Sequence, residues 1–217
     1  GEGPSKQDMA HGMPFSDSDG AYVVETLVAL DKGRKEVSWG NIVGCRWPND
    51  DPKTYLAQLK ASNRRRKKRG LPLKLSPIEA CARHVRHALS KTKTIVALGS
   101  YATKFAYQNN IKFDGVRGAP AKVHGFNVLP TYTPLTIQKA PRFGTVFKRD
   151  IAKAVRFHED RLVWTDPQVL YNPTVEQAQA FFERVKGEPL AYDVETDDVD
   201  CLTTELRCIG IGTNTHV

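Results

Sequence analysis

Residues 94–100, Thr94-Ile95-Val96-Ala97-Leu98-Gly99-Ser100, are a short apolar run that ends in a glycine and a serine. Such a run predicts a buried strand, and the Gly-Ser pair predicts a turn into a short helix through Tyr107. Upstream, Ser76-Pro77-Ile78-Glu79 combines a capping serine, a first-turn proline and a glutamate, which predicts a helix to about Ser90. A strand between two helices indicates an α/β fold.

The same alternation continues on both sides of this stretch. Ala21–Leu30 has apolar residues at helical spacing, and Val37–Val43 has the composition of a short strand. Val123–Leu129 predicts another strand, and Phe147–Phe157 predicts a closing helix. We therefore expect a three-layer α/β/α domain with a mainly parallel sheet over residues 1–157. Its ligand site should lie in loops beyond the carboxyl ends of the strands.

Between Asn49 and Leu75 this periodicity breaks down, and we interpret the segment as an exposed insertion. Two interpretations of its centre stay open, a solvated charged loop and an arm that contacts DNA phosphates. The candidate DNA-binding residues are six consecutive cations: Arg64, Arg65, Arg66, Lys67, Lys68 and Arg69.

Charge is distributed unevenly along the chain. From Glu188 onward, seven acidic residues accompany Arg207 as the one cation, a net charge of −6. Because the whole chain carries +8, the first 187 residues carry +14. A basic body suits a polyanionic partner such as DNA, since neutralised phosphates release counterions, although solubility alone is the other explanation.

Two further features bear on the cellular setting. No apolar run approaches the ~20 residues of a membrane span, so we expect no membrane association. The four cysteines are widely spaced, which favours reduced thiols or metal ligation over disulfides. We therefore expect a cytoplasmic protein of a bacterial or phage-infected cell.

The C-terminal part of the chain predicts a separate unit. Asp160–Pro173 has the composition of a linker, and Thr174-Val175-Glu176-Gln177 predicts the start of a capped helix. Leu190–Val194 and Arg207–Gly212 are expected to be antiparallel strands. We divide this part into a linker and helix at 158–187 and the start of a second domain at 188–217.

The first half of the chain carries several motifs in a fixed order. Residues 1–5 read Gly-Glu-Gly-Pro-Ser, and residues 12–15 read Gly-Met-Pro-Phe. Asn-Ile-Val-Gly-Cys-Arg-Trp-Pro follows at 41–48, and Ile-Val-Ala-Leu-Gly at 95–99. In this order the motifs resemble the family 4 type of uracil-DNA glycosylase, the iron–sulfur branch of that superfamily, over about residues 1–157.

This resemblance implies a pocket that holds uracil taken out of the DNA stack and hydrolyses its N-glycosidic bond. It implies that Phe15 stacks on the base and that Asn41, together with Gly3, binds it. Glu2 would orient or activate the attacking water. We predict that Glu2, Phe15, Asn41 and Thr133 surround one pocket at the carboxyl edge of the sheet.

Thr133 marks a departure from the family pattern. It stands before Pro134, where the family has a histidine that donates to the leaving uracil anion. A hydroxyl can donate a hydrogen bond but carries no positive charge, so it stabilises developing negative charge less. His11, near the first motif, is a second candidate for this donor.

The resemblance also implies a cofactor. Cys45 and Cys81 match in order two of the four cysteine ligands of the family's [4Fe–4S] cluster. The other two ligands would lie upstream of Gly1 in the full-length protein. The alternative is a pair of buried free cysteines.

A second resemblance covers the end of the chain. Pro189–Thr196, with Leu206–Gly212 after it, resembles the first motif of the 3′–5′ exonuclease domain beside family A DNA polymerases, which has a ribonuclease H-like fold. Asp193 and Glu195 alternate along the strand and so share one face, where they would hold Mg²⁺ or Mn²⁺. An acidic surface turn is the alternative. The resemblance implies a fragment truncated at both ends, with the remainder of a polymerase beyond it.

Three functions stay open for the first domain. It is an active uracil-DNA glycosylase, a catalytically inactive uracil- or DNA-recognition module of a DNA polymerase, or a structural domain with a vestigial pocket. The absence of a positive charge at Thr133, where the family has a histidine, separates the first two functions, because only the first needs a stabilised leaving group.

Overall fold

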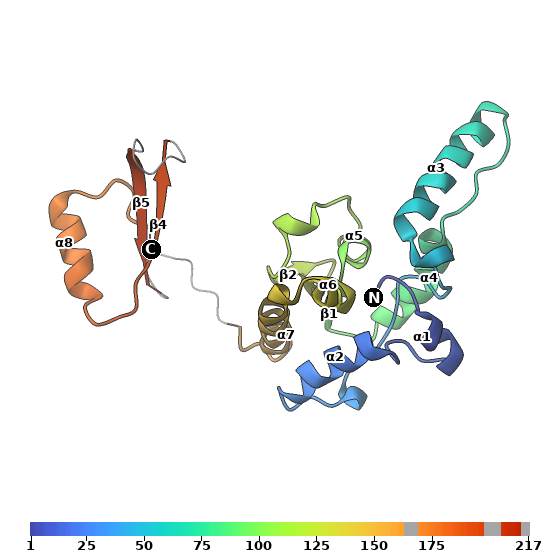
Figure 1. Cartoon of the computed structure of the whole chain (residues 1–217), viewed down its shortest axis with the longest axis horizontal. Helices are drawn as coiled ribbons and strands as arrows, with labels where there is room; N and C mark the ends of the chain where they lie inside the picture. Colours follow the sequence, from blue (N-terminus) through green and yellow to red (C-terminus); the bar gives the residue numbers. More distant parts are fainter. Residues whose placement is uncertain (163–168, 198–204, 214–217) are drawn as a thin grey trace. The chain divides into compact units, whose positions relative to one another are not determined.

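The chain, seen here in a computed structural model, divides into two units, residues 1–162 and residues 163–217 (Figure 1). The structure describes residues 1–162, 169–197 and 205–213. The helix predicted after Thr174 belongs to the second unit, together with the two strands that follow it.

A three-stranded sheet lies in the first unit, in the order β1 (Thr94–Leu98), β3 (Phe126–Thr131) and β2 (Ala121–Val123). β1 and β3 are parallel, whereas β2 is antiparallel to β3. The described sheet is therefore small and mixed, not mainly parallel. The predicted strand Val123–Leu129 is in fact a hairpin, because His124 and Gly125 take φ of 49° and 85°, the backbone of a two-residue turn.

Helices cover both faces of this sheet. On one face, α2 (Ser18–Val28), α6 (Pro134–Lys139) and α7 (Gly144–His158) pack around Leu98 of β1. On the other, α5 (Ser100–Tyr107) and α4 (Pro77–Leu89) pack in a cluster that contains Ala97. Neighbouring residues of β1 thus serve opposite faces. The mixed α/β fold with helices around a sheet is confirmed in outline.

The predicted start of α4 is confirmed in detail. The Ser76 hydroxyl accepts a hydrogen bond from the Glu79 N–H at 3.2 Å, and the Glu79 carboxylate accepts one from the Ser76 N–H at 2.7 Å. This reciprocal cap satisfies two N–H groups that the first helical turn leaves unpaired. α1 (Lys6–His11) has the same kind of cap, formed by Ser5 and Asp8.

The strand predicted at Val37–Val43 is wrong. This segment has no strand; it follows a short 3₁₀ turn at Arg34–Glu36 and runs as bends and extended loop. Its apolar residues reflect burial instead, because Ile42 and Val43 are 5% and 1% exposed in the cluster beneath α5. A buried loop has the same composition as a short strand.

The prediction that Asn49–Leu75 is irregular is also wrong, because most of this segment forms the helix α3 (Pro52–Lys68). Asp51 caps its first turn by accepting from the Thr54 N–H at 2.9 Å, and Pro52 occupies the first helical position. No residue of α3 is fully buried. Because charged residues dominate this helix, its few apolar residues show no helical period in the sequence.

The second unit contains α8 (Val175–Arg184), β4 (Ala191–Thr196) and β5 (Leu206–Gly212). The cap of α8 by Thr174 and the antiparallel pairing of the two strands are confirmed. All residues of β4 are exposed. No helix in the described part of the chain is long and apolar enough to cross a membrane.

Candidate functional site

The carboxyl ends of the parallel strands β1 and β3 meet at one edge of the sheet. There the Gly99 N–H donates to the Thr131 carbonyl at 2.9 Å, which fixes the two strand ends against each other. Glu2 reaches the same edge from the start of the chain. A methyl group added at Gly99 would lie 2.5 Å from Glu2 Oε1 and 2.7 Å from Thr133 Cγ2, so glycine is needed for this close approach.

The Glu2 carboxylate lies at the N-terminal end of α5. Its Oε1 accepts a hydrogen bond from the Tyr101 N–H at 3.0 Å, and the positive end of the helix dipole also favours its charge. Burial nevertheless raises the pKa of Glu2 above its ordinary value, and the Tyr101 bond opposes only part of this shift. A partly buried carboxylate with a raised pKa is suited to accept a proton from water.

Phe15 and Asn41 lie beside the adjacent residue, Gly1. A methyl group added at Gly1 would be 2.4 Å from Asn41 Oδ1 and 2.7 Å from Phe15 Cζ. The backbone of Gly1 accepts from the Ile42 N–H at 2.9 Å, which keeps the 41–42 segment against the start of the chain. The structure therefore brings Glu2, Phe15, Asn41 and Thr133 together around residues 1 and 2. We refer to these four residues as the Glu2 site.

Glycine is required at position 3 because the backbone passes close to the Trp47 side chain. A methyl group at Gly3 would lie 2.7 Å from the Trp47 ring, so the chain can pass this buried indole only as glycine. The Trp47 Nε1–H donates to the Glu2 carbonyl at 3.2 Å. Gly3 and Trp47 therefore fix the backbone that carries Glu2.

Residues 12–17 form the loop between α1 and α2, which we call the Phe15 loop. It is held by Asp8, which is buried. Its Oδ1 accepts from the Ser16 N–H at 2.7 Å and from the Ser16 hydroxyl at 3.0 Å. Burial alone would raise the pKa of Asp8, but hydrogen bonds from Ser16 and Ser5 outweigh it and hold the pKa below its ordinary value. The carboxylate thus stays charged and ties the loop to the cap of α1.

Arg34 is a residue of this neighbourhood that the sequence did not indicate. Its guanidinium donates to the carbonyls of Phe15 at 3.0 Å and Pro14 at 2.7 Å, and lies 4.6 Å from the centre of the Trp39 ring. Phe15 has a φ of 57°, which is costly for a bulky residue, so these contacts hold it there. Nothing in the local sequence pattern points to Arg34.

Thr133 occupies the N-cap of α6. Its Oγ1 accepts from the Thr136 N–H at 3.2 Å and lies 2.9 Å from the Thr136 hydroxyl. The methyl carbon of Thr133, rather than its hydroxyl, is the atom nearest to the Cβ position of Gly99. The hydroxyl therefore has a structural task beside any role toward a ligand.

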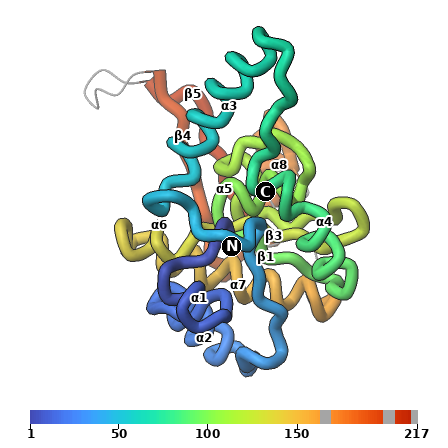
Figure 2. The backbone as a smooth tube through the Cα atoms, turned by 90° about the vertical axis from the view of Figure 1, so that its right-hand side faces the viewer, coloured from blue at the N-terminus to red at the C-terminus, as the bar shows by residue number. Residues whose placement is uncertain are grey.

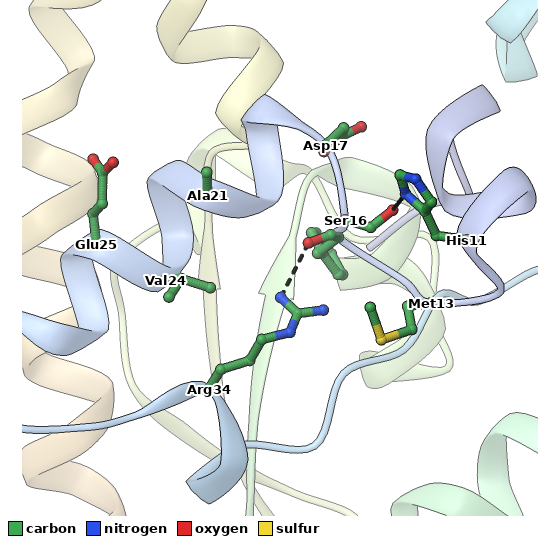
Figure 3. A pocket seen from close by; sticks show the side chains of 9 residues that line it. His11, Met13, Ser16, Asp17, Ala21, Val24, Glu25 and Arg34 are labelled. Atoms are coloured by element: carbon green, nitrogen blue, oxygen red, sulfur yellow. Dashed lines mark hydrogen bonds between the residues drawn. The ribbon is translucent and has the colours of Figure 1, made fainter.

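An open groove of about 680 Å³ is lined by Phe15 and Ser16 together with residues of α2 and Arg34 (Figure 3). His11 lies there, with Nδ1 3.3 Å from the Ser16 hydroxyl, alongside Met13 and Arg34. Glu2, Asn41 and Thr133 do not line this groove. The structure thus places His11 in a different neighbourhood from Thr133, the residue for which it is the second candidate.

The two cysteines proposed as cluster ligands lie near each other. The Gly44 N–H, next to Cys45, donates to Cys81 Sγ at 3.4 Å. Cys45 is exposed and Cys81 is partly buried, and both are free thiols. A backbone N–H that donates to a cysteine sulfur stabilises thiolate character, which suits a metal ligand.

In the second unit, Asp193 and Glu195 share one face of β4, opposite Gly210 and Cys208 of β5. Both are exposed. Over residues 1–162, 169–197 and 205–213, no three cysteine, histidine or acidic side chains are grouped closely enough to hold a metal ion. Cys45 with Cys81, and Asp193 with Glu195, are each a pair of candidate metal ligands among the described residues.

Comparison with protein families identifies a match to the first part of the chain. The model of the uracil DNA glycosylase superfamily matches residues 1–156, which include all four residues of the Glu2 site. Residues 157–217 lie outside this match. Since the match covers well over half of the chain, the chain belongs to the uracil DNA glycosylase superfamily.

Proposed function

We propose that this member of the uracil DNA glycosylase superfamily hydrolyses the N-glycosidic bond between uracil and deoxyribose in DNA. The observation that carries the proposal is the convergence of a partly buried carboxylate, an amide and an aromatic ring on residues 1 and 2, at the carboxyl edge of the sheet. An enzyme that acts on a base must stack it, read its pairing edge and place water at the sugar. The Glu2 site contains one group suited to each task.

In this proposal Phe15 stacks on the flipped base, and the Asn41 amide donates to and accepts from its pairing edge. Glu2 accepts a proton from water as the water oxygen bonds to C1′. The C1′–N1 bond breaks, and its electron pair leaves with uracil as an anion. The products are free uracil and an abasic site.

A catalytically inactive recognition module is the second candidate. The observation that favours it is the Thr133 hydroxyl, which caps α6 and carries no charge to offset the uracil anion. Such a module would keep the stacking and pairing contacts of Phe15 and Asn41 without cleavage.

The pH dependence of cleavage tests the role of Glu2. Only the carboxylate accepts a proton, so the single-turnover rate should rise with pH through a pKa above the ordinary glutamate value of about 4.3, and then level off. The measurement is release of uracil from duplex DNA between pH 4 and pH 8. A rate that falls as pH rises through this range would exclude Glu2 as the base.

Three finer assignments accompany this proposal. Assignment to the family 4 branch would make Cys45 and Cys81 two of four thiolate ligands of a [4Fe–4S] cluster, supported by their proximity. The pair Asp193 and Glu195 supports an exonuclease start, with Mg²⁺ or Mn²⁺ as its metal. On this view DNA is the partner, the remainder of a polymerase follows, and the protein acts in the cytoplasm of a bacterial or phage-infected cell.

A further inference from the structure

α3 and the extended segment that follows it project from the rest of the first unit (Figures 1 and 2). We call residues 52–75 the arm. It contains nine lysines and arginines and no aspartate or glutamate. So dense a charge of one sign on a projecting element attracts a polyanion.

The arm has two faces that the sequence does not separate. Lys53, Lys60, Arg64 and Lys68 follow one another at intervals of seven, four and four residues, and all are exposed. At 3.6 residues per turn these positions lie within an arc of about 80°, in a line about 22 Å long. We call these four residues the basic stripe.

The opposite face of α3 is turned inward. Tyr55, Leu59, Ser62 and Arg66 are spaced by four, three and four residues, and each is partly buried. Arg66, although it belongs to the run of six cations, donates through Nε to the Pro72 carbonyl at 2.6 Å. Its charge therefore points toward the returning segment rather than toward solvent.

Asn63 fixes the same returning segment. Its Nδ2 donates to the Lys74 carbonyl at 2.8 Å, and its Oδ1 accepts from the Lys74 N–H at 2.9 Å. Together with Arg66, it holds residues 72–74 along the inner face of α3. The returning segment therefore supports the helix and leaves the basic stripe uncovered.

We propose that the basic stripe binds the phosphate backbone of DNA that flanks the uracil. Within the described residues, Lys60, Arg64 and Lys68 form no hydrogen bond or ion pair, so their charges are available to a ligand. A straight line of like charges matches a uniformly charged polymer. Lysine and arginine contacts to phosphate carry no sequence information, so the arm strengthens binding without selecting a sequence. This inference rests on DNA as the proposed substrate.

The test is the salt dependence of binding to a labelled duplex without uracil, which leaves base recognition out of the measurement. Each phosphate contact contributes ~0.9 to the slope of log affinity against log salt concentration. The triple variant Lys60→Gln, Arg64→Gln, Lys68→Gln should therefore lower the slope by about two to three. An unchanged slope would overturn the proposal.

Two matched controls separate the basic stripe from net charge. Lys148→Gln, Arg149→Gln, Arg156→Gln removes three exposed cations from another helix, α7, and should change the slope by far less. Arg64→Gln should lower the slope by about one, whereas Arg66→Gln, on the inner face, should leave it nearly unchanged. Equal losses from both triple variants, or from both single variants, would show that diffuse charge binds DNA and would overturn the assignment.

The outcome is independent of cleavage. If wild-type protein releases no uracil but the basic stripe still sets the salt slope, the proposed catalytic function fails and the arm assignment stands. If uracil is released and the slope is insensitive to the triple variant, only the arm assignment fails.

Discussion

Replacement of Asp150 by alanine is expected to lower the free energy of unfolding by about 3–5 kcal/mol. Asp150 lies on α7 and is 3% exposed. It accepts hydrogen bonds from Arg117 Nη1 at 3.0 Å and from the fully buried Thr131 hydroxyl at 2.7 Å. Alanine would leave both donors without their acceptor, and one of them is charged.

The geometry around Asp150 leaves little room for relaxation. Gly118 has a φ of 72°, and a methyl group added there would lie 2.7 Å from Asp150 Oδ1. The Gly118 N–H donates to the Pro130 carbonyl at 2.7 Å, and Lys153 Nζ donates to the Gly118 carbonyl at 2.7 Å. Loss of Asp150 would therefore also loosen the end of β3, which leads to Thr133.

Urea unfolding of Asp150→Ala and of a surface control checks this expectation. Asp160 pairs with Lys93, but their side chains are 74% and 49% exposed. Asp160→Ala should therefore cost no more than about 1 kcal/mol. Similar losses of unfolding free energy in the two variants would mean that the hydrogen bonds of Asp150 do not stabilise the contact between α7 and β3 more than a surface ion pair does.

Thr133→His is expected to raise the rate of uracil release by about 10²–10³-fold. A protonated imidazole can donate to the departing uracil anion with a full positive charge, which the threonine hydroxyl lacks. The same change removes the cap of α6, because Thr133 Oγ1 accepts from the Thr136 N–H. We expect a loss of about 0.5–2 kcal/mol of stability alongside the gain in rate.

Two control variants accompany this experiment. Thr133→Ser keeps a capping hydroxyl and should leave both rate and stability nearly unchanged. Glu2→Gln, added to Thr133→His, should abolish the gain, while its amide oxygen can still accept from the Tyr101 N–H. A gain that survives Glu2→Gln would remove Glu2 from the chemistry.

Local signals in the sequence were sufficient for several elements. Ser76-Pro77 with Glu79 predicted α4, and the run from Thr94 to Ser100 predicted β1 and the turn into α5. These signals rely on caps and on a glycine, whose physical causes lie within a few residues of each other. The same holds for Thr174 at the start of α8.

Other elements could not be predicted from local pattern. α3 buries only part of Tyr55, Leu59 and Arg66, so no apolar stripe marks its helical period. The turn at His124 carries a positive φ on a residue that gives little turn signal. The inner face of α3 is held by Pro72 and Lys74, which follow it in the chain, and the His124 ring lies 3.2 Å from the Tyr107 carbonyl, 17 residues earlier.

The residues of the candidate site were predicted from the order of the motifs along the chain, and hydrophobic periodicity gave no indication of them. Glu2 meets Tyr101 across a separation of 99 residues, which no local pattern encodes. The resemblance supplied Glu2, Phe15, Asn41 and Thr133, but not their supports. Arg34 acts through long-range hydrogen bonds that are evident only in three dimensions.

The claim that the Glu2 site receives uracil is tested most directly by equilibrium binding, without reliance on cleavage. The ligands are two DNA duplexes that differ at one position, a non-hydrolysable 2′-fluorinated deoxyuridine in one and thymidine with the same sugar in the other. We expect wild-type protein to bind the uracil duplex more tightly, and we expect Phe15→Ala and Asn41→Ala each to lose that preference. Equal affinity of wild-type protein for both duplexes, or a uracil preference that persists in both variants, would contradict it.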